Sequence, residues 1–166
     1  MTQDLPTVQS GVDMSVPVAQ FELRPSLSVV LGGDDESSNH PDHVHRVRRP
    51  DLAGAIRERR NVRREWIAAG HNPASLVVAL EIDVLIDGDA SSARAHLRRR
   101  GEKLFGSTVR YVGTARGLAS LILDAYVAEV ADAVILHPLD RDGLDPGTTR
   151  SLIGREVLPL LRDKIF

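Results

Sequence analysis

Apolar and polar residues follow one another along this chain in patterns that predict strands and helices in alternation. Residues 76–86 alternate with a period of two, which places four aliphatic side chains on one face of a strand and Glu81 with Asp83 on the other. Residues 52–69 instead repeat their apolar positions at spacings of three, four and seven, with Asp51 able to cap the resulting helix. The central part of the chain therefore predicts a helix followed by a long strand.

The same reading extends to both sides of this pair. Further strands are predicted over 27–31, 43–47, 109–112 and 133–136, and further helices over 89–100, after the cap residue Thr114, and after Asp145 and Pro146 at the start of a final helix. Strands that alternate with helices of this length imply parallel crossovers, so the predicted class is α/β, with mainly parallel strands. Ligands bind such sheets at the carboxyl ends of the strands, which directs attention to Gly32, Gly113 and His137.

Composition adds limits to this picture. The 166 residues are 42% apolar, and we expect a loose arm over 1–25 followed by a single α/β domain over 26–166. No apolar run approaches the roughly 18 residues that predict a membrane span, and no signal-peptide pattern stands at the start. Cysteine is absent, which excludes disulfides and thiolate chemistry. We expect a soluble, cytoplasmic protein.

Charge is concentrated in one segment, because residues 46–64 hold eight arginines against Asp51 and Glu58. The arginines at 57, 60, 63 and 64 fall largely off the apolar stripe of the helix, so we expect them to form its solvated side. Binding of nucleic acid is the alternative, but the segment lacks interleaved aromatic residues and the whole chain carries a net charge of -2. A nucleic-acid partner is therefore the weaker hypothesis.

Several polar residues are candidates for a site. His40, His43 and His45 lie near acidic residues and could hold a metal, although polar histidines in a loop are common and we predict no metal site. Glu81 and Asp83 would raise each other's pKa if both were buried, whereas a solvated or helix-facing pair would not. The imidazole of His137 could donate to a cofactor, act as a base, or simply bond to the backbone.

Gly113 and Thr114 stand at a predicted helix start, a geometry that suits an anion as well as a plain cap.

Four segments, taken in order, resemble the C-terminal half of the luciferase-like monooxygenases, in particular the branch with nitrilotriacetate and desulfurising monooxygenases. They are Ala68–Leu76, Glu81–Ile86 with Ala93–Ala95 behind it, Val112–Thr114, and Val130–Pro138 with Glu156–Arg162 behind it. The resemblance implies part of a (β/α)₈ barrel, and it implies use of reduced FMN, or of a deazaflavin in one branch. It also implies oxidation of a small organic substrate by molecular oxygen, with a separate flavin reductase as partner.

Carried over to this sequence, the resemblance places Gly32, Gly33, Ser37 and Ser38 in a loop that cradles the flavin phosphate, with Gly113 and Thr114 as further contacts and His137 as the catalytic candidate. The acidic residues between Gly33 and Ser37 depart from the family pattern and would repel a phosphate. A complete barrel needs about 250 residues, so a homodimer or a complementary barrel half is expected. The predicted function is an FMN-dependent monooxygenase-like oxidoreductase; a non-catalytic flavin-binding or subunit-interaction module is the alternative.

Overall fold

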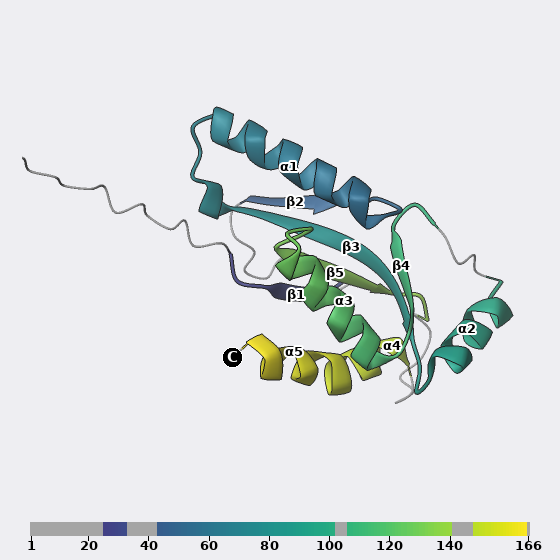
Figure 1. The fold of residues 1–166 in the computed structure, drawn as a ribbon. Coiled ribbons are helices and arrows are strands. Elements are labelled where there is room, and N and C mark those ends of the chain that lie inside the picture. The colour runs from purple at the N-terminus through teal and green to yellow at the C-terminus, as the bar shows by residue number, and fades with distance from the viewer. Residues whose placement is uncertain (1–24, 33–42, 102–105, 141–147, 166) are drawn as a thin grey trace, which may run out of the picture.

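The computed structural model describes residues 25–32, 43–101, 106–140 and 148–165. Five parallel strands form one sheet: β1 (Ser28–Leu31), β2 (His43–Val47), β3 (Leu76–Ile86), β4 (Val109–Gly113) and β5 (Ala133–Pro138). The helices between and after them are α1 (Leu52–Ala68), η1 (Pro73–Ser75), α2 (Ala90–Arg99), α3 (Ala115–Val127), α4 (Thr149–Leu152), η2 (Ile153–Val157) and α5 (Leu158–Ile165). The parallel α/β class predicted from the sequence is confirmed (Figure 1).

Strand β3 organises the sheet, because it pairs with three others. One of its edges pairs with β5, and the other pairs first with β2 over Leu76–Leu80 and then with β4 over Ile82–Ile86. On the far side of β5 the sheet ends in β1, giving the order β1-β5-β3-β2 with β4 beyond β2 along β3. The sheet is not closed. The arrangement therefore carries part of a barrel-like wall, and the carboxyl end of β2 lies beside the middle of β3.

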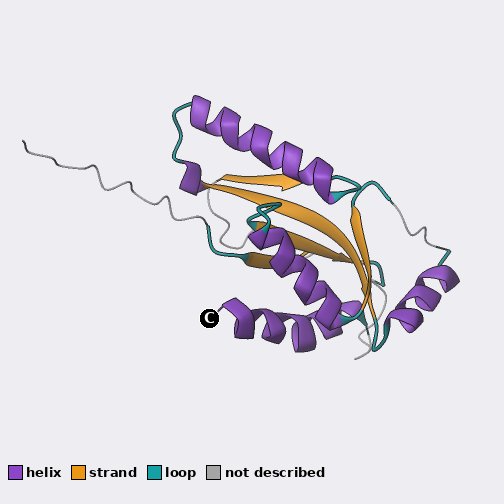
Figure 2. Ribbon diagram, in the orientation of Figure 1, coloured by secondary structure: helices purple, strands orange, loops and turns teal. Residues whose placement is uncertain are grey.

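The two faces of the sheet differ in what covers them. One face packs against α1, α3 and the C-terminal helices, and this layer holds the main core, which includes Val47, Leu80, Ile82, Leu118 and Ile153. Figure 2 shows α1 running along the sheet beside β2, and α3 lying close to α5. The opposite face has a small apolar floor, and we call it the inner face; its apolar residues are Val30, Val44, Val77, Ala79, Ala133 and Ile135.

Local signals in the sequence placed most of these elements. Asp51 caps α1 by accepting the Gly54 N–H at 2.7 Å, and Thr114 caps α3 through the Gly117 N–H. The prediction that β3 has one aliphatic face and one face with Glu81 is confirmed, since its even-numbered residues lie in the main core while Glu81 lies on the inner face. Each of these features depends on a few neighbouring residues, which is why sequence reasoning found them.

The final helix differs from its prediction. It begins at Thr149 with Thr148 as its cap, while Asp145 and Pro146, the predicted start, lie outside the described residues. It also contains a wide turn at η2, where the Leu158 N–H donates to the Ile153 carbonyl five residues back. Pro159 has no N–H to continue the regular ladder, and the wider turn accommodates this loss.

None of the helices within the described ranges is long and apolar enough to cross a membrane.

Candidate functional site

A buried carboxylate on the inner face is the centre of the candidate site. Glu81 lies in the middle of β3 with only 2% of its surface exposed. Two arginines from the end of β2 bind its two oxygens: Arg46 Nε donates to Oε1 at 2.8 Å and Arg48 Nε donates to Oε2 at 2.6 Å. Both arginines are open to solvent, with 42% and 64% of their side chains exposed. The cluster therefore couples a buried anion to two accessible cations at the carboxyl end of a strand.

His137 joins the same cluster from the end of β5. Its Nε2 lies 3.1 Å from Glu81 Oε2, and its side chain is 13% exposed. Gly32 makes this position possible, because a Cβ built on Gly32 would lie 2.2 Å from His137 Nδ1. The Gly32 N–H in turn donates to the Leu136 carbonyl at 2.8 Å. Two residues that the sequence singled out, Gly32 and His137, are thus brought into direct contact, and Gly32 holds the space that the ring needs.

The ionisation of Glu81 follows from its surroundings. Burial raises the pKa of this carboxyl, but the hydrogen bond from Arg48 and the charge of Arg46 outweigh it, so the pKa lies below its ordinary value. An ionised carboxylate accepts hydrogen bonds and cannot donate them, so the bonded Nε2 of His137 carries a proton. Glu81 and Asp83 were expected to raise each other's pKa only if both were buried, and Asp83 is partly exposed, so that condition is not met. Asp83 has its own partner, Arg110, at 3.0 Å.

Gly113 and Thr114 lie elsewhere, at the end of β4. The hydroxyl of Tyr111 fills the space left by the absence of side chains at Gly113 and Gly117, since a Cβ on these glycines would lie 2.7 and 2.0 Å from its oxygen. The Thr114 N–H donates to this hydroxyl at 3.3 Å, and the hydroxyl donates to the Thr114 carbonyl at 3.1 Å. The Thr114 side chain caps the helix. An anion at this helix start would therefore have to displace Tyr111.

The predicted cofactor contacts are not all gathered in one place. His137 is level with Asp83 along β3, whereas Gly113 is level with Ile86 and pairs with the opposite edge of that strand. Three residues of strand span about 10 Å, and β3 itself stands between the two positions. The remaining predicted contacts, Gly33, Ser37 and Ser38, lie outside the described residues. The structure joins Gly32 to His137 and places Gly113 and Thr114 apart from them.

A second buried carboxylate stands at the opposite end of the sheet. Asp132, just before β5, is fully buried and binds Arg59 at 3.1 Å and Arg63 at 2.6 Å, and it accepts the Val78 N–H at 3.0 Å. These bonds tie α1 to the start of the sheet. The expectation of a solvated arginine face is wrong for Arg63, because Asp132 draws its guanidinium inward. The arginines at 57, 60 and 64 are exposed, as expected.

The histidines that were weighed as metal ligands have other partners. His45 Nε2 lies 3.0 Å from Glu58 Oε1, while His43 packs on Trp66 with ring centroids 4.7 Å apart. Both face α1, which confirms that they share one side of β2. His40 lies outside the described residues. Within the described ranges no group of three or more acidic or histidine side chains is placed to hold a metal ion.

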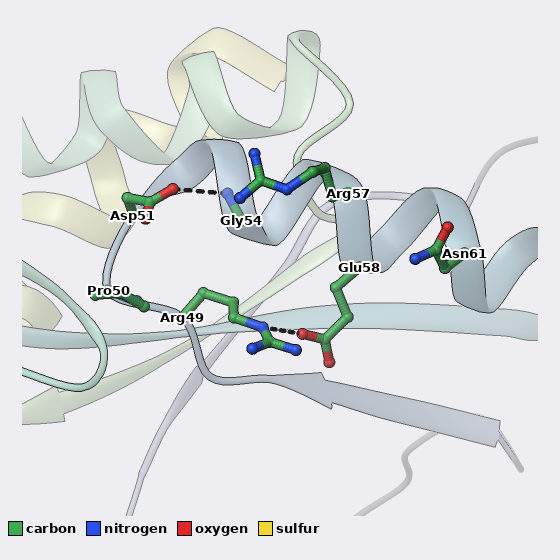
Figure 3. Close-up of a pocket in the computed structure, with 7 residues that line it drawn as sticks. All are labelled: Arg49, Pro50, Asp51, Gly54, Arg57, Glu58 and Asn61. Atoms are coloured by element: carbon green, nitrogen blue, oxygen red, sulfur yellow. Dashed lines mark hydrogen bonds and ion pairs between the residues drawn. The ribbon is translucent and has the colours of Figure 1, made fainter.

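An open hollow of about 460 Å³ adjoins the carboxyl end of β2, where α1 begins (Figure 3). In it Asp51 accepts a hydrogen bond from the Gly54 N–H and Arg49 pairs with Glu58, while the side chain of Arg57 lies on the other side of α1 from Arg49 and Glu58 (Figure 3). It is lined by Arg49, Pro50, Asp51, Gly54, Arg57, Glu58 and Asn61. Since its acidic side chains already have hydrogen-bond partners, the hollow widens this edge without forming an enclosed site.

Sequence reasoning missed two members of the cluster, Arg46 and Arg48. Their signal was the alternation that continues past β2, since Val44, Arg46 and Arg48 are spaced by two residues and Val44 belongs to the inner face. What the sequence could not give was the register, which sets Arg46 level with Ala79 on β3 and so brings both arginines to Glu81.

The fold and this edge define a parallel α/β unit that forms part of a barrel-like wall, with a charged cluster at the carboxyl ends of its strands. No protein-family model matches the sequence, and no curated protein does. Solved structures do match the fold. The crystal structure of riboflavin lyase (RcaE), with modified FMN and its substrate riboflavin, superposes with a TM-score of 0.59 at 14% identity, covering 74% of this chain and 39% of that one.

Two further crystal structures show the same likeness. Long-chain alkane monooxygenase (LadA) gives a TM-score of 0.53 at 14% identity, covering 73% of this chain and 36% of its own. DmoA from Hyphomicrobium sulfonivorans gives 0.55 at 12% identity, covering 82% and 41%. The chain therefore spans about two fifths of the length of these proteins. The expected partial barrel-like α/β fold, with mainly parallel strands, is confirmed.

Proposed function

We propose that this protein binds FMN and acts as a monooxygenase-like oxidoreductase on a small organic substrate, as a short or partial-barrel relative of the nitrilotriacetate and desulfurising monooxygenases. One observation carries the proposal: Glu81, His137 and two arginines form an oriented, charged cluster on the inner face of an open parallel sheet. The two arginines and His137 come from the carboxyl ends of β2 and β5, the ends at which barrel enzymes bind their ligands. A structure of the same fold holds a modified FMN.

The side chains at this edge suit a flavin. Arg46 and Arg48 hold solvent-exposed guanidinium groups at this edge, which suit a phosphate or the electron-rich edge of the ring. Apolar residues such as Val30 and Ile135 line the floor below and suit the flat ring system. Gly113 and Thr114 fit a phosphate less well, because Tyr111 occupies their space. Arg46, Arg48 and His137 are therefore the proposed contacts, beside Gly32.

Each side chain has a definite task in this proposal. Reduced flavin, when bound, supplies the electrons for oxygen chemistry, and the protein supplies position and dryness. Glu81 accepts a hydrogen bond from the Nε2–H of His137 and so fixes the orientation and the tautomer of the ring. The Nδ1 atom, which faces Gly32, is then the acceptor nitrogen that can hold or take a proton.

The proposed partner is a second barrel half, either a second copy of this chain or a complementary protein, with a flavin reductase supplying reduced cofactor. The open sheet supports this part of the proposal. Within the described residues β1 pairs with β5 alone and β2 pairs with β3 alone, so each leaves one edge unpaired. Sedimentation equilibrium over a hundredfold range of concentration tests self-association. If the protein is a monomer at every concentration, only a complementary protein remains as the proposed partner.

Flavin titration tests the central claim. Quenching of FMN fluorescence is expected at micromolar protein, and deazaflavin is the second ligand to compare. The variant His137→Asn should weaken binding or abolish oxygen consumption with reduced FMN, whereas His71→Asn, an exposed histidine at the opposite end of the sheet, should change neither. Absence of binding of either flavin at tens of micromolar would refute the proposal.

A non-catalytic flavin-binding or subunit-interaction module is the second candidate, and the occupied helix start favours it. Tyr111 fills the space beside Gly113 that a phosphate would need, as expected of a site that has lost its ligand. Oxygen consumption separates the two candidates. A module would bind FMN without consuming oxygen when reduced flavin is supplied, while the enzyme would consume oxygen and release product.

A further inference from the structure

We propose that Asp87 is a site of spontaneous covalent modification, at which the aspartate converts to isoaspartate through a cyclic succinimide formed with the Gly88 nitrogen. The two residues form the turn between the end of β3 and the start of α2. The reaction needs no enzyme, metal or cofactor, so it is independent of the proposed flavin function. The contact between the reacting groups, the open space around them and a contrast with two other aspartates support the assignment.

The two reacting groups are in contact. The Gly88 N–H donates to Asp87 Oδ1 at 2.7 Å. The carbon that must be attacked, Asp87 Cγ, is bonded to this oxygen, so the carboxyl group lies against the attacking nitrogen. Short polar side chains commonly bond nearby backbone groups. At Asp87 the bonded nitrogen belongs to the very next residue, which is the one that ring closure requires.

Gly88 leaves its nitrogen accessible. The residue is exposed, and a Cβ built on it would meet nothing within 4 Å. Glycine has no side chain to shield the nitrogen, and its backbone adopts the widest range of dihedral angles. Asp87 is held from the other side, because its own N–H donates to the Gly113 carbonyl at 3.0 Å. The ring can therefore close at an anchored strand end with no packed side chain in its way.

The reaction conserves atoms and electrons. The Gly88 nitrogen forms a bond to Cγ of the protonated Asp87 carboxyl, and the hydroxyl of that carboxyl leaves with the proton of the nitrogen as one water molecule. A second water molecule then opens the succinimide at either carbonyl. Opening at Cγ restores aspartate, whereas opening at the former main-chain carbonyl gives isoaspartate, in which the chain runs through the side chain. Nothing is oxidised or reduced.

Two neighbouring kinds of turn show an arrangement that disfavours this reaction. Asp51 bonds the N–H three residues further on, and Asp89 bonds those two and three residues further on, as helix caps do. These carboxyl groups are thereby directed away from the next nitrogen. The residues that follow them, Leu52 and Ala90, also carry side chains and begin a helix. Asp87 combines the contact with an unshielded nitrogen.

Isoaspartate at this position would disturb α2. It lengthens the main chain by one carbon atom between β3 and the helix. Asp89, which caps α2 by accepting the N–H groups of Ser91 and Ser92, lies two residues further on. Hydrogen exchange at these two amides should therefore be several-fold faster in the isoaspartate form, because the cap is displaced from the strand that anchors it.

Incubation of the folded protein in water labelled with heavy oxygen tests the site. Each opening of the succinimide leaves one labelled oxygen at Asp87, and electron-transfer mass spectrometry of a digest distinguishes isoaspartate from aspartate. Both should accumulate at Asp87 several-fold faster than at Asp89. Equal rates at the two residues, or no label at Asp87, would overturn the proposal.

Gly88→Ala tests the role of the open nitrogen. Since the added Cβ meets nothing within 4 Å, the variant should fold, and its methyl group should slow labelling at Asp87 several-fold. Gly154→Ala is the matched control, because a Cβ there also meets nothing within 4 Å, and it should label as wild type does. An unchanged rate in Gly88→Ala would overturn the proposal.

A synthetic peptide of residues 84–92 separates the effect of the folded turn from that of the Asp–Gly sequence alone. If the turn holds the two groups in reactive contact, the folded protein labels Asp87 at least as fast as the peptide does. Labelling that is several-fold slower in the folded protein would show that the fold protects the pair, and it would overturn the proposal.

Discussion

Two buried carboxylates of this protein, Asp132 and Glu81, have the same kind of partner but lie at opposite ends of the sheet. Asp132 and Glu81 each bind two arginines, yet Asp132 lies where β5 begins and Glu81 lies toward the carboxyl ends of the strands. At the first position the arginines come from α1 and are packed under it. At the second they come from the end of β2 and reach solvent. The chemistry of an arginine–carboxylate cluster is therefore not enough to assign its role, which depends on the end of the sheet and on access.

Removing the charge at Asp132 should have the largest effect. Asp132→Asn leaves Arg59 and Arg63 without their buried partner, and loss of one member of such a cluster costs about 3 to 5 kcal/mol. Urea denaturation measures the change, with Asp124→Asn on the exposed side of α3 as the control for the same substitution. A loss of stability below about 1 kcal/mol would show that the Asp132 cluster is not needed to stabilise the fold.

Acid should reproduce part of this loss. Burial raises the pKa of Asp132, but the Val78 N–H and the charges of Arg59 and Arg63 outweigh it, so the pKa of the folded state is lowered. A lowered pKa gives stability that is fully present above the unfolded value, near 3.9, and is lost as the pH falls below it. The free energy of unfolding should therefore decrease below about pH 4. Asp132→Asn should show a shallower decrease than wild type, and an identical slope would contradict this account.

Gly32→Ala should disturb the other cluster by an intermediate amount. The added Cβ would lie 2.2 Å from His137 Nδ1, so the ring must move and its bond to Glu81 must lengthen. Overpacking of this kind costs about 1 to 3 kcal/mol. The NMR signals of the His137 ring should shift, whereas Gly88→Ala, where nothing lies within 4 Å, should leave them in place. If the His137 signals do not shift in Gly32→Ala, Gly32 is not needed to position the His137 ring.

Glu81→Gln should have the smallest effect on stability and the clearest effect on binding. Arg46 and Arg48 can turn to solvent when the charge is removed, so we expect a cost of about 1 kcal/mol, well below that at Asp132. Flavin affinity should change, because the variant no longer fixes His137 or Arg48. Glu65→Gln, on the exposed side of α1, is the control. A stability loss equal to that of Asp132→Asn would show that both clusters are structural.

The sequence by itself determined the elements and their faces, because periodicity, caps and turns depend on residues that are near one another in the chain. It indicated the parallel α/β class, the alternation along β3, the cap at Asp51, and Gly32 and His137 as separate candidates at strand ends. The wide turn before Pro159 also has a local cause, and a closer reading of that proline would have found it.

Only the tertiary structure decided which of the arginines meet a carboxylate. The pairing of β2 with β3 in one particular register brings Arg46 and Arg48 to Glu81, and the docking of α1 on the sheet brings Arg59 and Arg63 to Asp132. Tyr111 took the space at Gly113 and Gly117 for the same reason. Each of these contacts joins side chains through packing and strand register, and these are set by the burial of the whole core rather than by any short stretch of sequence.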